Sequence, residues 1–184
     1  MEKKNEAKKI KKLIFKLKKI QPNDTREMLF MEYTKTKNIT AQNLEIAECS
    51  LQDAEKLFPL HIYYTQEEVL PEWKKINLAL ERLKLEKILR TQKVLAVKQK
   101  DSFCAKAQTN AISKNFIQIG GVFTKKEFRS KGLASCLVKK LAEEFQTENK
   151  KSVLFVNKKN KPAICAYKKA GFSAFAKYEM LYYK

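Results

Sequence analysis

The chain of 184 residues has little cysteine and almost no histidine, the side chains that most often bind zinc. Its four cysteines, Cys49, Cys104, Cys136 and Cys165, are far apart and form neither a CxxC pair nor a Cys/His cluster. This spacing argues against a zinc site and against a disulfide framework, so we expect reduced thiols. His61 is the only histidine, so a multi-histidine metal site is excluded and a Ser-His hydrolase would depend on that one residue. The sequence predicts no bound metal.

Long apolar runs are also missing, and glycine and proline are scarce. With four Gly, four Pro and 44% hydrophobic residues, the composition is that of a globular protein. No apolar run is long enough to cross a bilayer, and the basic first 20 residues lack the apolar core and cleavage site of a signal peptide. We therefore expect a cytoplasmic protein of one domain with an extension.

The charge is strongly of one sign, with a net charge of +19. Such a charge suggests a nucleic acid or an anionic membrane as a partner. Only four of the 39 basic residues are arginines, however, and nucleic-acid interfaces favour arginine over lysine. A lysine-rich solvated surface is the preferred interpretation, and a nucleic-acid partner stays open.

The first 43 residues are predicted to form a basic helix and an extension, ahead of a domain over 44–184. Apolar residues recur at near-helical spacing between lysines, and Pro22 with Asn23-Asp24 ends the pattern. This amphipathic helix either docks its apolar stripe on the domain or serves as a membrane or RNA arm. Docking is the preferred interpretation. The apolar positions are Ile10, Leu13, Ile14, Leu17 and Ile20.

The remaining hydrophobic pattern predicts a mixed α/β domain with one sheet. Apolar runs over 28–33 and 44–49 are expected to pair as strands around the polar stretch 35–40. The other expected strands cover 93–98, 103–108, 116–123 and 152–156, with a closing aromatic segment over 172–183. One expected helix starts at Ser50, and three others cover 72–90, 132–148 and 162–170.

The segment Gly120-Gly-Val-Phe-Thr-Lys-Lys-Glu-Phe-Arg-Ser-Lys-Gly-Leu-Ala-Ser135 is suited to binding an anion. A strand ends near Thr124 and a helix opens near Gly132, so backbone amides at the helix start lack partners within the helix. These amides and the helix dipole both favour negative charge. Gly132 permits close approach of a ligand, and Arg129 and Lys131 add positive charge. Neither GxxxxGK[ST] nor GxGxxG is present, which argues against a P-loop or a dinucleotide fingerprint.

Two motifs together carry a resemblance to a known family. The spacing Arg-x-x-Gly-x-Ala from Arg129 to Ala134 resembles the pyrophosphate loop of the GNAT N-acetyltransferases. Asn160-Lys-Pro-Ala-Ile-Cys-Ala-Tyr-Lys-Lys-Ala-Gly-Phe172 resembles the closing signature N-x-x-A-x-x-x-Y-x-x-x-G-F of the same family. The similarity is clear over 93–184, and it implies an α/β GNAT-type fold with a mixed central sheet, helices on both faces and a splayed strand pair for CoA.

The resemblance implies acetyl-CoA as co-substrate and transfer of its acetyl group to an amine. The amides of 129–135 would hold the pyrophosphate, Asn160 would meet the pantetheine, and the hydroxyl of Tyr167 would face the sulfur as general acid. The adjacent Gly120-Gly121 suits a bulge that starts the splay. The positions implied for the cofactor are Val122, Thr124, Arg129, Ser130, Lys131, Gly132, Leu133, Ala134, Ser135, Asn160 and Tyr167.

The general base and the acceptor are left open by the sequence. No acidic residue occurs in the strand 115–123, where family members often carry one. Glu67 and Glu68, in the connection between the first two helices, could take the proton, bind a cationic substrate or only solvate a loop. Tyr63-Tyr64 and Tyr182-Tyr183 could line an acceptor pocket, but packing in the core or at its edge is the preferred interpretation. A non-catalytic acetyl-CoA-binding module, a tRNA-directed acetyltransferase and a homodimer stay open as alternatives.

Overall fold

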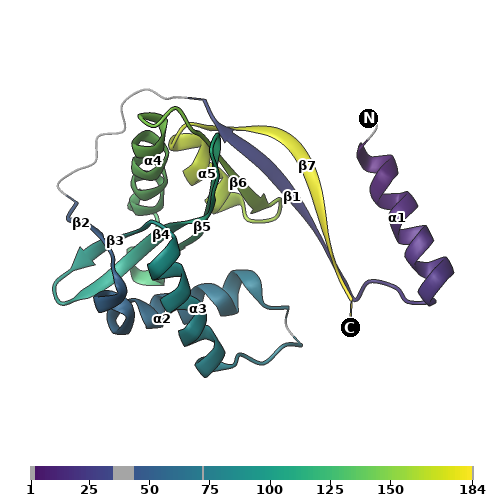
Figure 1. Ribbon diagram of the computed structural model, residues 1–184, viewed down its shortest axis with the longest axis horizontal. Coiled ribbons are helices and arrows are strands. Elements are labelled where there is room, and N and C mark those ends of the chain that lie inside the picture. The colour runs from purple at the N-terminus through teal and green to yellow at the C-terminus, as the bar shows by residue number, and fades with distance from the viewer. Residues whose placement is uncertain (1–2, 35–43, 72, 184) are drawn as a thin grey trace.

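One seven-stranded sheet organises the chain in the computed structural model, which describes residues 3–34, 44–71 and 73–183 (Figure 1). The strand order is β2-β3-β4-β5-β6-β1-β7, and only the β5–β6 pair is parallel. The strands are β1 (Asp24–Tyr33), β2 (Ile46–Glu48), β3 (Val94–Gln99), β4 (Ser102–Ile112), β5 (Phe116–Thr124), β6 (Lys151–Asn157) and β7 (Phe172–Tyr182). The α-helices are α1 (Lys3–Lys18), α2 (Ala54–Tyr64), α3 (Leu78–Thr91), α4 (Leu133–Gln146) and α5 (Lys161–Lys169), with short turns η1 (Leu51–Asp53), η2 (Thr65–Val69) and η3 (Lys126–Phe128).

Helices cover both faces of the sheet, as the resemblance implies (Figure 1). On one face, Leu57 and Leu60 of α2 and Leu85 of α3 pack against β3, β4 and β5. On the other face, Leu137 and Leu141 of α4 pack against β5 and β6, together with Tyr167 of α5. Each fully buried leucine contributes about 1.5–3 kcal/mol to folding. The predicted mixed α/β architecture, with one sheet and helices on both of its faces, is thus confirmed.

The sheet opens between β5 and β6. Their parallel pairing runs only from Phe116↔Lys151 to Ile119↔Leu154, and the rest of each strand has a partner on its other side only. The β4–β5 register gains one residue on β5 between Gly120 and Phe123. Gly121 there has φ +56°, a conformation that glycine adopts readily. The predicted bulge and splay are both present.

Strand β1 lies inside the sheet, between β6 and β7, although the sequence placed residues 1–43 outside the domain. The predicted pairing of 28–33 with 44–49 is therefore wrong, because β1 pairs with β6 and β7 while β2 pairs with β3. An alternating apolar pattern identifies a strand but does not identify its neighbours. The polar stretch 35–40 and the boundary at 43 lie outside the described residues.

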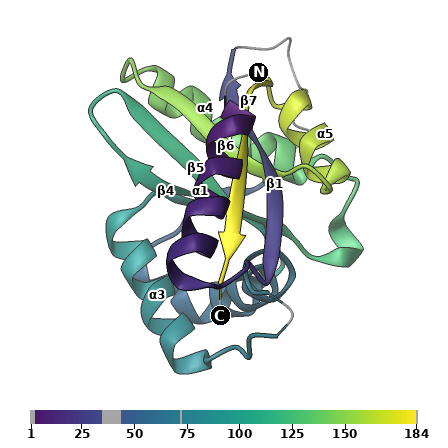
Figure 2. The same ribbon diagram turned by 90° about the vertical axis from the view of Figure 1, so that its right-hand side faces the viewer.

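Helix α1 is present as predicted, but it does not dock its apolar stripe on the domain. Figures 1 and 2 place it beside β7, where Lys11 Nζ lies 3.1 Å from Glu179 Oε2. Leu17 is 71% exposed, and Ile10 and Leu13 are also more than half exposed. The docking interpretation is therefore wrong for most of the stripe. Among the described helices, none combines the length and the apolar character that a membrane span requires.

Candidate active site

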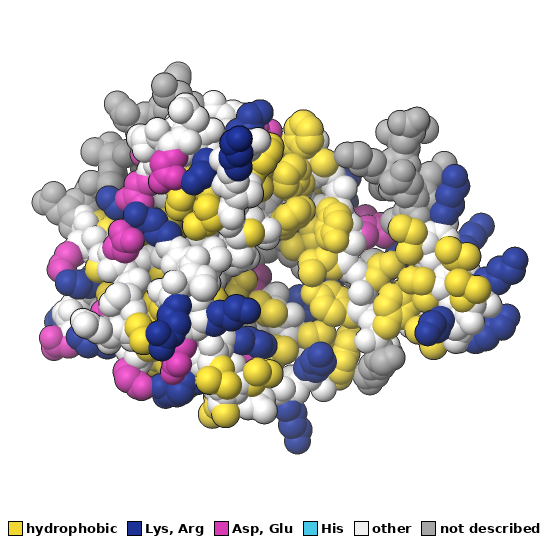
Figure 3. Space-filling view, in the orientation of Figure 1, with side chains coloured by type: hydrophobic (Ala, Val, Ile, Leu, Met, Phe, Trp, Pro, Cys, Tyr) yellow, Lys and Arg dark blue, Asp and Glu magenta, His cyan; other side chains and the backbone are white. Residues whose placement is uncertain are grey.

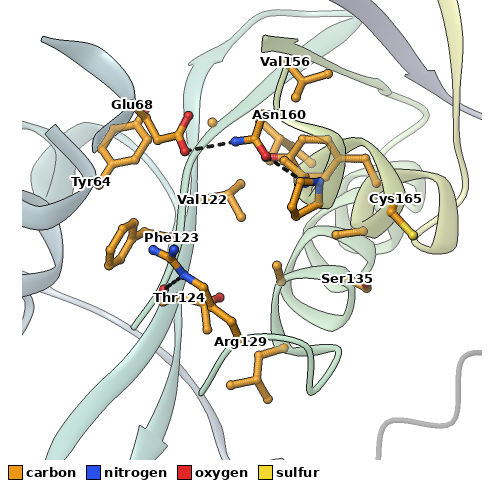
Figure 4. A pocket seen from close by; sticks show the side chains of 18 of the residues that line it. Tyr64, Glu68, Val122, Phe123, Thr124, Arg129, Ser135, Val156, Asn160 and Cys165 are labelled. Atoms are coloured by element: carbon orange, nitrogen blue, oxygen red, sulfur yellow. Dashed lines mark hydrogen bonds between the residues drawn. The ribbon is translucent and has the colours of Figure 1, made fainter. Parts of the chain in front are cut away.

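A cavity of about 550 Å³ lies at the splay (Figure 4). It is enclosed by β5 on one side, the end of β6 and helix α5 on the other, the start of α4 below, and side chains of α2 and η2. Most of the residues predicted from the sequence line it, whereas Glu67 and Lys131 do not. The predicted residues in the lining are Glu68, Val122, Thr124, Arg129, Ser130, Gly132, Leu133, Ala134, Ser135, Asn160 and Tyr167.

The turn before α4 forms a cradle of backbone amides at one end of the cavity. Ser130 (φ 63°) and Gly132 (φ 79°) both have left-handed conformations, and such alternation points successive N–H groups toward one concavity. Within the described residues, the amides from 130 to 135 donate to no acceptor. A Cβ added to Gly132 would meet nothing within 4 Å, so this side of the turn is open. The cradle therefore suits an anion.

The two cationic side chains beside the cradle point elsewhere. Arg129 donates from Nη2 to Glu67 Oε2 at 2.7 Å and from Nε to the Thr124 carbonyl at 3.0 Å. Lys131 places its Nζ 5.1 Å from the centre of the Phe128 ring, outside the cavity. The cradle accordingly relies on its amides and on the helix dipole for positive potential.

Asn160 and Glu68 meet across the cavity. Asn160 caps α5 by accepting a hydrogen bond from the Ala163 amide at 3.0 Å, and its Nδ2 donates to Glu68 Oε1 at 3.0 Å (Figure 4). Burial raises the pKa of Glu68 above the usual carboxyl range, the hydrogen bond from Asn160 opposes this, and the charge of Glu67 adds to it. Glu68 is thus a carboxylate with increased basicity that faces the cavity. Glu67, the other predicted candidate, is paired with Arg129 instead.

Two tyrosines complete this end of the cavity. Burial raises the pKa of Tyr167, with smaller contributions from nearby Tyr64 and Glu68, so its hydroxyl stays protonated at neutral pH. Burial also raises the pKa of Tyr64, while a hydrogen bond to the Gly121 backbone acts in the opposite direction. Tyr64 lines the cavity, although packing was the preferred interpretation of its sequence pattern. Its position one helical turn before Glu68 is the feature that could have identified it.

A row of polar side chains on β4 lies next to the bulge of β5. Lys106 is completely buried and donates to Gln108 Oε1 at 2.8 Å, and Gln108 donates to Asn110 Oδ1 at 3.3 Å. A Cβ on Gly120 would meet the Asn110 side chain and one on Gly121 the Gln108 side chain, and at Gly121 the positive φ also favours glycine. Lys106 Nζ also lies 5.1 Å from the centre of the Tyr64 ring. Burial lowers the pKa of Lys106 to about 7.

His61 lies outside the cavity lining and has a structural partner. Its Nε2 is 2.9 Å from Glu81 Oε2, and both side chains are buried. Within the described part of the chain, no three His, Cys, Asp or Glu side chains gather as a metal site requires. For acid–base chemistry the cavity offers the Glu68 carboxylate, the hydroxyls of Tyr64 and Tyr167, and backbone amides.

Solved structures with the same fold are numerous. An acetyltransferase assigned to the GNAT family from Novosphingobium aromaticivorans is 19% identical, with a TM-score of 0.67, over 88% of this chain and 65% of its own. A GNAT-family acetyltransferase from Colwellia psychrerythraea is 12% identical, with a TM-score of 0.68, over 89% and 58%. A protein described as a predicted acetyltransferase from Clostridium acetobutylicum, solved with acetyl-CoA, is 17% identical, with a TM-score of 0.58, over 72% of this chain and 91% of its own.

These solved structures, together with the splayed sheet, show that the chain has the fold of the GNAT acetyltransferases. Residues 96–181, which hold both motifs, match the model of the family described as FR47-like protein. No curated protein matches the sequence significantly. The chain spans less than two thirds of the length of the first two of these relatives, at 65% and 58%.

Proposed function

We propose that the protein is an acetyl-CoA-dependent N-acetyltransferase. The observation that carries this proposal is the cavity itself, which joins an amide cradle for a phosphate group to a basic carboxylate and a protonated tyrosine. A cavity with these two ends suits a long ligand that has an anionic group at one end and reacts at the other.

The residues present fit acetyl-CoA. The cradle from Ser130 to Ser135 has free amides and no side chain in the way at Gly132, which suits a pyrophosphate. The unpaired edge of β5 beyond Ile119 offers backbone groups at Val122 to a ligand that lies along the strand. When bound there, acetyl-CoA would supply the acetyl group as a thioester, which is reactive toward amines.

Glu68 is the proposed general base. An alkyl amine has an ordinary pKa of about 10.4, so at neutral pH it must lose a proton before it can attack. The raised pKa of Glu68 makes it a better proton acceptor than an ordinary carboxylate, and Asn160 holds its Oε1 toward the cavity. Tyr167 is the proposed general acid, because its hydroxyl remains protonated and the residue lines the cavity.

The proposal can be tested by thiol release from acetyl-CoA with a panel of primary amines, while protein melting is followed in parallel. Acetyl-CoA is expected to raise the melting temperature, because ligands that bind the native state stabilise it. Ala134→Glu places a negative charge in the cradle. A carboxylate in the first turn of a helix stabilises it by about 0.3–1 kcal/mol, so this variant should fold while losing the acetyl-CoA response.

Each outcome has a distinct meaning. A melting shift without acetyl transfer to any amine would identify a binding module rather than an enzyme. A shift that survives in Ala134→Glu would show that the cradle does not hold the cofactor. The control is Lys140→Glu, which places the same charge on the exposed side of α4. Ala142→Glu is not suitable, because Ala142 is buried.

A further inference from the structure

An exposed patch of aromatic side chains lies next to the cavity, on the part of the sheet that α2 and α3 leave open. Four rings contact one another in a row across β6, β1 and β7: Phe30 and Phe155 (centres 5.0 Å apart), Phe30 and Phe175 (5.9 Å), and Phe155 and Tyr178 (5.5 Å). Phe175 is 69% exposed and Tyr178 is 53% exposed. We call these four residues the aromatic platform.

The pleat of the strands explains why these rings share one face. Phe155 lies between Leu154 and Val156, which point into the core on the α4 side. Phe30 lies directly opposite Phe155 in the β1–β6 register, next to the buried Met31. Because successive side chains of a strand point to opposite faces, the platform faces the α2 side of the sheet. Figure 3 shows apolar side chains gathered there, in the hollow between the body of the molecule and α1.

The platform is continuous with the candidate active site. Phe155 belongs both to the platform and to the cavity lining, and Met28 of β1, two residues before Phe30, also lines the cavity. Arg26, further along β1, donates to the Glu68 carbonyl at 3.0 Å and to the Leu70 carbonyl at 3.3 Å, which fixes η2 beside this strand. A molecule lying on the platform would therefore reach Glu68 at the cavity.

We propose that the aromatic platform binds the acceptor, and that the acceptor is a polypeptide with apolar residues close to its reactive amine. This inference rests on the proposed function. Exposed clustered aromatic side chains mark interaction sites, because burying them releases water from a large apolar area. Amines without an apolar body would leave this area exposed.

The dimensions favour a peptide over a small amine. Three neighbouring strands span about 10 Å, and the three residue steps from Phe175 to Tyr178 span about 10 Å at strand spacing. An extended peptide of about three residues covers this length. Helix α1 stands beside β7 and makes the platform the floor of a trough, which accepts an extended chain more readily than a second folded copy of the protein (Figures 1 and 3).

The test compares two peptides of equal length that begin with the same residue and carry the same soluble tail. One continues with apolar residues and the other with Ser, Thr, Asn and Gln. We expect the KM of the apolar peptide to be about tenfold lower, since two buried aromatic contacts together contribute about that factor. In the double variant Phe175→Ser/Tyr178→Ser, this preference should fall to less than twofold, with kcat and the KM of acetyl-CoA unchanged.

Leu83→Ser is the matched control, because Leu83 of α3 is 63% exposed and lies outside the platform and the cavity. It should keep the preference for the apolar peptide. A peptide that carries both an amino terminus and a lysine, read by mass spectrometry, shows which amine is modified, and either one supports the proposal. Equal KM values for the two peptides, or a preference that survives in the double variant, would overturn it.

Direct binding of a fluorescent apolar peptide, measured by anisotropy, separates this proposal from the proposed function. Binding that the double variant loses, without acetyl transfer to any amine, supports the platform and contradicts the enzyme. Transfer to small amines with no binding of the apolar peptide contradicts the platform only. A dimer that the double variant converts to a monomer in sedimentation would show that the patch contacts a second copy, which also overturns the proposal.

Discussion

On the α2 side, one half of the sheet is covered by helices and the other half is exposed. Over β3, β4 and β5, the helices α2 and α3 bury Leu57, Leu60 and Leu85 in a closed core. Over β6, β1 and β7, no described helix covers the sheet, and the aromatic platform stays exposed. Glu68 and Tyr64 lie where the covered half ends, beside the cavity. The covered half stabilises the fold, and the open half is the surface that we propose for binding.

This comparison predicts that side chains of similar size have different effects in the two halves. In the covered half, a substitution should reduce stability. In the open half, it should change the recognition of the acceptor, and at the border between them it should change the rate of the reaction.

The largest effect is expected at the border, for Glu68→Gln. Removal of a general base typically lowers the rate by about 10²- to 10⁴-fold, and the amide keeps the shape of the side chain. In the unmodified protein, kcat/KM should fall as the pH decreases through the raised pKa of Glu68, because the base must be deprotonated. The measurement is kcat/KM against pH, with exposed Glu148→Gln as the control. A variant that retains more than a tenth of the activity would rule out Glu68 as the base.

The next effect is on stability in the covered half. Leu57 is fully buried, so Leu57→Ala should reduce the free energy of unfolding by about 2–5 kcal/mol. Phe175→Ala in the open half removes a larger side chain, yet it should cost less than about 0.5 kcal/mol because the ring is exposed. Denaturant unfolding of the two variants gives both values. Similar losses would mean that the platform is part of the folding core.

A smaller effect, on the pH dependence of stability, is expected from Lys106. Its pKa of about 7 in the folded protein lies below its ordinary value of 10.5, so between these values the unfolded chain binds more protons. Stability should therefore rise with pH in this window, by up to about 1.4 kcal/mol per pH unit, and be lost as the pH falls toward 7. Lys106→Met should flatten this slope between pH 7 and 9, whereas exposed Lys87→Met should not. An unchanged slope in Lys106→Met would contradict the lowered pKa.

The sequence predicted the parts of the site that depend on local backbone requirements. The glycine pair at the bulge, the left-handed Gly132 and the cap Asn160 each meet a local geometric demand, so their residue types are informative. The place of β1 in the sheet and the platform were not predicted, because both depend on which distant strands become neighbours. Lys106 was missed because a lysine in a strand pattern gives no indication that it is buried without a carboxylate.

The smallest effect should come from Glu67→Gln, and it separates the two carboxylates that the sequence could not distinguish. Glu67 is partly exposed and pairs with Arg129 at 2.7 Å, and such pairs contribute about 0–1 kcal/mol. Its side chain does not line the cavity, so kcat should stay within about threefold of the unmodified protein. Thiol-release kinetics of Glu67→Gln beside Glu68→Gln provide the measurement. A loss in Glu67→Gln as large as that in Glu68→Gln would mean that Arg129 releases Glu67 during the reaction, and that the border between the two halves carries two catalytic carboxylates.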